Sequence, residues 1–129
     1  MLVEEAASAR SRALLRDDSE IIVWWATPVE CVSAISRRQR ENFLSVVAAN
    51  ESIARLQALV PSLREVHPSS RVRDVALRLL RTHALRTADA LQLAAALVAA
   101  DDDPGALDFV CLDERLVLAA QREGFTVAP

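Results

Sequence analysis

Cysteine, lysine and long hydrophobic runs are scarce or missing in this chain of 129 residues. Cys31 and Cys111 are the only cysteines, which is too few for a disulfide framework or a cysteine-based zinc site. We therefore expect both to be reduced core residues. Lysine is absent, and the net charge of −3 argues against a protein that attracts nucleic acid through its overall charge.

No apolar run is long and unbroken enough to span a bilayer, since even Leu85–Ala100 is interrupted by Arg86 and Asp89. The first residues, MLVEEAASAR, are acidic and lack the hydrophobic region of a signal peptide. We expect a cytoplasmic protein that does not bind a membrane. The length and the 52% hydrophobic content predict one domain over residues 1–129 with a substantial core.

The segment Leu85–Ala100, with the sequence LRTADALQLAAALVAA, is the most hydrophobic part of the chain. Its alanines and leucines favour helix, and it is apolar on nearly every side, so we expect a buried helix. Thr87 is the expected N-cap, which puts Asp89 in the first turn. Asp89 then either faces the positive end of the helix dipole or serves as a metal ligand.

Strand and helix patterns alternate along the rest of the chain. Short apolar runs predict strands at residues 21–26, 63–67, 109–112 and 125–128. Amphipathic patterns predict further helices at residues 2–17, 27–40, 42–60, 69–83 and 114–123. Such alternation is typical of a parallel sheet covered by helices, so the expected fold class is α/β.

The strand predicted at residues 21–26 ends in two neighbouring tryptophans, Trp24 and Trp25, which should point to opposite faces. Core packing explains them better than base stacking, which would need exposed rings. Thr27 and Glu30 follow with the spacing of a capping box, in which the Glu30 carboxylate bonds back to the Thr27 amide. A carboxylate at a strand–helix junction is also where α/β proteins place ligand groups.

Glu30, Asp89 and Asp113 are each predicted to lie at or near a helix N-terminus. Glu30 and Asp113 follow strands, and such junctions share one edge of a parallel sheet. Three acids gathered there would repel one another without a cation. Carboxylates and water suit Mg²⁺ or Mn²⁺, and such ions promote phosphodiester cleavage by activating water.

Three segments of the chain resemble acidic motifs of PIN-domain ribonucleases, and the nearest group is the VapC-type toxins of toxin–antitoxin pairs. The segments are Pro28–Glu30, Thr87–Ala94 with its ADALQLA sequence, and Phe109–Leu116. The ADALQLA sequence is the most specific of the three. The resemblance covers the chain from Leu2 onward. It implies a three-layer α/β/α sandwich, Mg²⁺ or Mn²⁺, cleavage of single-stranded RNA, a cognate antitoxin and a homodimer.

The resemblance assigns the catalytic, metal-binding roles to three acids: Glu30, Asp89 and Asp113. Arg37, Arg38 and Arg86 are candidate RNA contacts, since arginine binds phosphate in a bidentate manner. The solvated C-terminal end of a helix explains the Arg37–Arg40 cluster better than RNA binding does, because arginine is favourable at that end. His83, near another helix end, is expected to complement the dipole rather than to bind metal.

The family's first strand has no counterpart in this sequence. In the family that strand ends in a metal-binding Asp and lies centrally in a sheet of order 3-2-1-4-5. We therefore expect two half-sheets with facing unpaired edges, and a nuclease that is inactive or impaired as written. Either translation starts further upstream or the chain is a remnant of a longer ancestor.

Two other functions compete with the nuclease. One is a catalytically inactive PIN-like module that binds an antitoxin or a second copy of itself. The other is a phosphoacceptor receiver domain, which is also α/β with acids at one edge of its sheet. A receiver domain would require a lysine beside those acids, and the sequence contains none.

Overall fold

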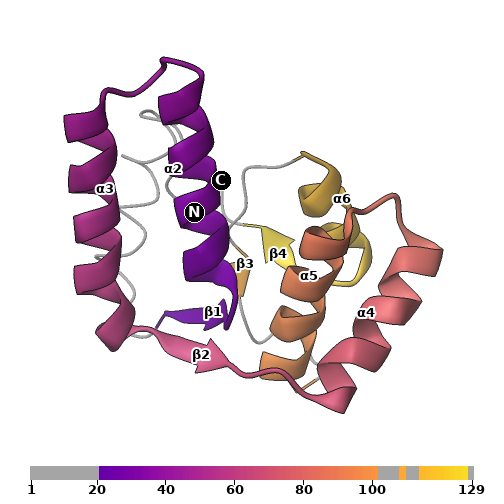
Figure 1. The fold of residues 1–129 in the computed structure, drawn as a ribbon. Helices are drawn as coiled ribbons and strands as arrows, with labels where there is room; N and C mark the ends of the chain where they lie inside the picture. Colours follow the sequence, from indigo (N-terminus) through magenta and orange to yellow (C-terminus); the bar gives the residue numbers. More distant parts are fainter. Residues whose placement is uncertain (1–20, 102–107, 110–113, 128–129) are drawn as a thin grey trace. The chain divides into compact units, whose positions relative to one another are not determined.

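The computed structural model describes residues 21–101, 108–109 and 114–127 (Figure 1). Within them, the elements are β1 (Ile22–Trp24), α2 (Thr27–Arg40), α3 (Val46–Leu59), η1 (Val60–Ser62), β2 (Arg64–Val66), α4 (Ser70–Thr82), α5 (Thr87–Ala99), β3 (Asp108–Phe109), α6 (Glu114–Arg122) and β4 (Thr126–Val127). The α/β class expected from the sequence is confirmed. The helix predicted at residues 2–17 lies outside the described part. No described helix has the length and hydrophobicity to cross a membrane.

The chain divides into two compact units, which are described separately. The first unit holds α2, α3 and η1, within residues 26–64. The second unit holds residues 22–25, which include β1, and the described residues after residue 64. The expectation of one domain over residues 1–129 stays a prediction.

The first unit is a pair of helices, α2 and α3, that pack against each other. The Ser45 hydroxyl caps α3 by accepting a hydrogen bond from the Ala48 amide at 3.0 Å. Helix α3 therefore begins at Val46, not at residue 42 as predicted. The reason lies in Asn42, which takes a left-handed φ of 63° and turns the chain between the two helices.

The buried core of the first unit is small. Ile35 and Ala49 are its buried apolar side chains within the described residues. The guanidinium of Arg38 lies 5.6 Å from the centre of the Phe43 ring, a cation–π contact. Four large apolar side chains are 59–68% exposed: Val29, Phe43, Val46 and Val47.

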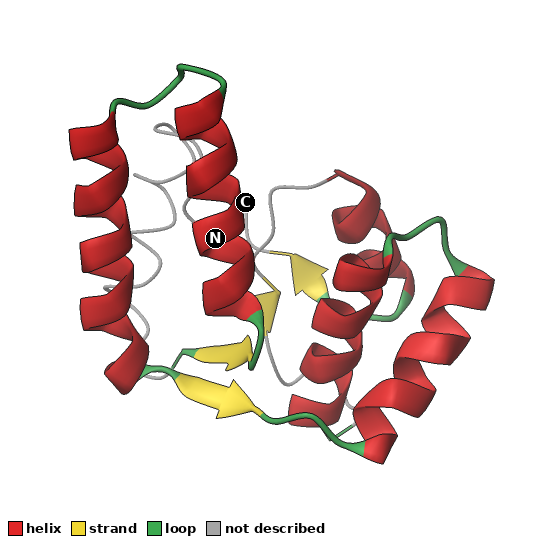
Figure 2. Ribbon diagram, in the orientation of Figure 1, coloured by secondary structure: helices red, strands yellow, loops and turns green. Residues whose placement is uncertain are grey.

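The core of the second unit is formed by α4, α5 and α6 (Figure 2). Helix α5 buries five residues, which are Ala90, Leu93, Ala94, Ala95 and Leu97. The prediction of a buried helix is therefore confirmed. Helix α4 contributes one apolar stripe with helical spacing, which consists of Val72, Ala76 and Leu79. The largest fully enclosed side chains include Leu79, Leu93 and Leu116, all at most 1% exposed.

Local capping determines where several of these helices begin and end. The Ser69 hydroxyl accepts from the Val72 amide at 3.2 Å and caps α4, which begins one residue after the start of its predicted range. Gly124 follows α6 with a φ of 101°, a conformation that glycine adopts without steric cost. Helix α6 ends at Arg122, one residue before the end of its predicted range.

The two threonine caps predicted from the sequence are wrong. Thr27 and Thr87 are the first helical residues, and the cap positions fall on Ala26 and Arg86, which make no side-chain cap bond. The amide of Glu30 donates to the Ala26 carbonyl at 3.1 Å. Each helix therefore begins one residue earlier than expected, so Thr27 cannot act as the cap of a capping box with Glu30.

The described strands form two separate two-stranded sheets, β1 with β2 and β3 with β4. Strands β3 and β4 are parallel, with Asp108 opposite Thr126. The arrows of β1 and β2 also run in one direction (Figure 2), and the Trp25 amide donates to the Val66 carbonyl at 3.0 Å. That these two sheets are the halves of one PIN-like sheet stays a prediction, as does the expectation that their edges face each other.

Candidate functional site

Asp89 lies in the first turn of α5, as predicted, and is half-buried. Next to it in the chain, Ala90 is fully buried, which fixes this end of the helix in the core of the second unit. Among the described residues, the Asp89 carboxylate has no hydrogen-bond or ion-pair partner. The first amides of α5 give this end a partial positive charge that favours an anionic side chain.

Glu30 lies in the first turn of α2 and is also half-buried, so its predicted position after a strand is confirmed. It belongs to the first unit, whereas Asp89 belongs to the second. Asp113 lies outside the described residues. Within residues 21–101, 108–109 and 114–127, no three His, Cys, Asp or Glu side chains form a group that could hold a metal. The gathering of the three acids stays a prediction.

The arginines proposed as RNA contacts lie at helix ends. Arg37 and Arg38 are in the last turn of α2, where the sequence predicted a solvated basic cluster. Arg37 is exposed, and Arg38 is half-buried against Phe43. Arg86 is exposed at the N-cap of α5. Their contact with RNA stays a prediction.

Cys31, on α2, is a free thiol, as predicted, although it is half-buried rather than fully buried. Burial raises the pKa of this thiol, and the carboxylate of neighbouring Glu30 raises it further. A raised pKa keeps the sulfur protonated at neutral pH, so Cys31 is not an activated nucleophile. Cys111 lies outside the described residues.

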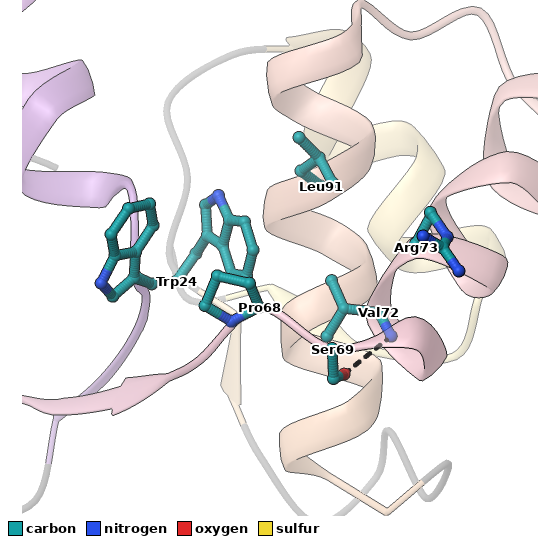
Figure 3. A pocket seen from close by; sticks show the side chains of 7 residues that line it. Trp24, Pro68, Ser69, Val72, Arg73 and Leu91 are labelled. Carbon is teal, nitrogen blue, oxygen red and sulfur yellow. Dashed lines mark hydrogen bonds between the residues drawn. The ribbon is translucent and has the colours of Figure 1, made fainter.

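A groove of about 470 Å³ opens on the second unit, and the sequence analysis did not find it. It is lined by Trp24, Trp25, Pro68, Ser69, Val72, Arg73 and Leu91. Figure 3 shows Val72 and Arg73 on α4 and Leu91 on α5, with the Ser69 cap bond drawn as a dashed line. The volume is within the range of small-ligand sites, which is about 300–1,000 Å³.

The two tryptophans of this groove differ in exposure. Trp24 is 7% exposed, whereas Trp25 is 50% exposed. The core-packing interpretation therefore holds for Trp24 and is wrong for Trp25, because neighbouring residues at the end of a strand point to opposite faces and only the face of Trp24 is buried. The feature of the sequence that could have indicated this groove is the pair of neighbouring tryptophans at the end of a predicted strand.

A second polar cluster joins the end of α4 to the residue after α6. His83 Nε2 lies 2.7 Å from Glu123 Oε2, and Arg78 Nη2 donates to Glu123 Oε1 at 2.8 Å. The side chains of His83 and Glu123 are only 5% and 13% exposed. Because an ionised carboxylate can only accept, Nε2 of His83 carries the proton. Nδ1 is buried without a partner in the described part of the chain.

The Arg78 hydrogen bond is the main cause of the lowered pKa of Glu123. Burial opposes it, and the His83 contact lowers the pKa further. The carboxylate is therefore ionised at neutral pH and holds both partners. This cluster was missed because His83 and Glu123 lie 40 residues apart and neither belongs to a motif.

No protein-family model, curated protein or solved structure matches this chain.

Proposed function

We propose that this chain has the architecture of a PIN-type, metal-dependent endoribonuclease of toxin–antitoxin systems, with Asp89 as its principal metal ligand. The observation that carries the proposal is the position of Asp89. It is a half-buried carboxylate in the first turn of the most buried helix, and it opens the ADALQLA sequence.

The arrangement of strands adds support. Two parallel two-stranded sheets, with helices between their strands in the sequence, agree with a three-layer α/β/α sandwich that lacks its central strand. Glu30 also occupies the predicted place. It lies in the first turn of α2, three residues after the helix begins at Thr27, and α2 is the element that follows β1. Asp113 is proposed as the third acid from the sequence alone.

Carboxylate oxygens fit the preference of Mg²⁺ and Mn²⁺ for hard ligands. The ion would supply activation of the attacking water and stabilisation of the leaving oxygen. Asp89 would contribute a negatively charged oxygen ligand, and the buried helix α5 holds that carboxylate in a fixed position relative to the core. The proposed RNA substrate, cognate antitoxin and homodimer follow from the same resemblance.

The decisive experiment incubates the full chain with Mg²⁺ or Mn²⁺ and a labelled single-stranded RNA. We expect weak cleavage, because the family's first metal-binding Asp has no counterpart in this sequence. This cleavage should disappear with a chelator and fall about a hundredfold or more in Asp89→Asn, because a ligand to the ion contributes several kcal/mol. Asp74→Asn, which changes an exposed carboxylate on α4, is the matched control and should cleave as the unmodified chain does.

Binding of Mn²⁺, followed by calorimetry, gives a second readout that does not depend on turnover. Equal Mn²⁺ affinity in the unmodified chain and in Asp89→Asn would remove Asp89 from the site. RNA or antitoxin binding without any cleavage would instead identify the chain as an inactive interaction module.

A further inference from the structure

We propose that the groove beside Trp25 binds a base of single-stranded RNA, with the Trp25 ring stacking on the base and Arg73 pairing with a phosphate. The proposal rests on the function proposed above for its choice of RNA as the occupant. It adds a recognition site built from β1, α4 and α5, none of whose lining residues is one of the three acids.

The exposed ring of Trp25 is the first argument. Half of this residue is open to solvent although it borders an apolar groove. Aromatic rings that are exposed in this way offer a flat face on which any base can stack, regardless of sequence. The exposed ring that base stacking requires is therefore present at Trp25 and absent at Trp24.

The charge of Arg73 is the second argument. Arg73 is exposed on the first turn of α4, and its side chain has no hydrogen-bond or ion-pair partner among the described residues. Its neighbours differ, since Arg71 pairs with Asp101 at 3.5 Å and Arg78 pairs with Glu123. Arg73 therefore presents at the groove a guanidinium that no described residue pairs with, and a phosphate matches its charge and geometry.

The apolar wall of the groove is the third argument. Pro68, Val72 and Leu91 line it, and these side chains suit the flat apolar faces of a base better than they suit a charged side chain. Leu91 follows Asp89 by two residues on α5, a rise of about 3 Å along the helix axis. Two residues also correspond to a rotation of about 200° around the helix, so Leu91 and Asp89 lie on different sides of α5 and the groove is a site separate from the proposed metal ligand.

The test measures binding of a short labelled oligouridylate by fluorescence anisotropy, in the presence of a chelator so that no cleavage occurs. We expect Trp25→Ala to weaken binding about 5- to 150-fold, the range for loss of one stacked base. Trp25→Phe keeps an aromatic face and should retain most of the affinity. Leu77→Ala removes another exposed apolar side chain of the second unit, outside the groove, and should have no effect.

The salt dependence tests Arg73 separately. Arg73→Gln should lower the slope of log affinity against log salt concentration by about 0.7, the value for one phosphate contact on a single strand. Arg81→Gln, at the other end of α4, should leave the slope unchanged. An oligoglutamate peptide is the competing probe, because an acidic peptide would pair with Arg73 without needing the Trp25 ring.

Three outcomes would overturn the proposal. They are unchanged oligouridylate affinity in a folded Trp25→Ala variant, no oligouridylate binding by the unmodified chain, and equal binding of oligoglutamate. Each is distinguishable from failure of the proposed nuclease, because cleavage is assayed with metal and depends on Asp89. If the unmodified chain cleaves RNA and Trp25→Ala binds oligouridylate with unchanged affinity, the proposed base-binding role of the groove is wrong and the proposed nuclease stands. If binding depends on Trp25 and no cleavage occurs with metal, the proposed nuclease is wrong and the base-binding role stands.

Discussion

The Glu123 cluster provides a stability prediction that can be worked out from the structure. Each carboxylate oxygen accepts from a different partner, Oε1 from Arg78 at 2.8 Å and Oε2 from His83 at 2.7 Å. A second Arg78 nitrogen lies 3.3 Å from Oε2. Glu123→Gln keeps the shape of the side chain and one oxygen acceptor, and it removes the charge.

The expected loss follows from how buried each contact is. Hydrogen bonds to charged groups contribute about 1.5–3 kcal/mol, whereas exposed ion pairs contribute about 0–1 kcal/mol. The Arg78 side chain is 52% exposed, so its bonds to Glu123 contribute little to the free energy of unfolding. The buried contact with His83 contributes most of the expected loss. We expect Glu123→Gln to lower the free energy of unfolding by about 1–2 kcal/mol. For a chain of this size, that lowers Tm by about 4–8 °C.

Urea unfolding followed by tryptophan fluorescence measures this loss. Both tryptophans of the chain belong to the second unit, as do His83 and Glu123, so the signal reports on the unit that contains the cluster. Asp74→Asn removes an exposed carboxylate on α4 and should change the free energy of unfolding by no more than about 0.5 kcal/mol.

The pH dependence gives a sharper check. Because the pKa of Glu123 is lowered in the folded chain, its stabilising contribution is fully present above the pKa of an unfolded glutamate, about 4.3. It is lost as the pH falls through the lower, folded value. The difference between the unmodified chain and Glu123→Gln should therefore be constant from neutral pH to about pH 5 and shrink below about pH 4. A difference that is absent at pH 7, or unchanged at pH 3, would refute the reasoning.

Two further predictions concern the core and a helix cap. Leu93→Ala empties a site that is fully buried in α5 and should cost about 2–5 kcal/mol in urea unfolding, whereas Leu77→Ala, 56% exposed on α4, should cost less than about 1 kcal/mol. Ser45→Ala removes the cap of α3 and should reduce helicity measured by circular dichroism, at a cost of about 1 kcal/mol. Ser45→Asp preserves a side-chain acceptor and should restore the helicity; equal loss in both variants would contradict a capping role.

Much of the local structure could be predicted because it depends on neighbours in the sequence. The apolar composition of Leu85–Ala100 predicted a buried helix, and the amphipathic patterns predicted the bounds of α4 and α6 to within one residue. The threonine caps failed by one residue. A capping pattern predicts that a helix begins near the threonine. The backbone conformation of the residue before it decides at which residue the helix begins, and therefore which amides have no partner within the helix.

The candidate site was predictable only in part. Asp89 and Glu30 were placed in first helical turns by sequence, and the structure agrees. The groove was not predictable, because it requires the end of β1, the start of α4 and a residue of α5 to lie around one space. The exposure of Trp25 is likewise a tertiary property, since the sequence pattern of a buried strand extended through it.

The sequence by itself determined the α/β class, the buried character of α5 and the first-turn positions of two acids. These depend on composition, periodicity and capping, which act over a few residues. Only the tertiary structure decided that Glu123 holds both His83 and Arg78, and that Trp25 and Arg73 border one groove. Side chains far apart in the chain meet only when helices pack, and packing is settled by the burial of the whole core.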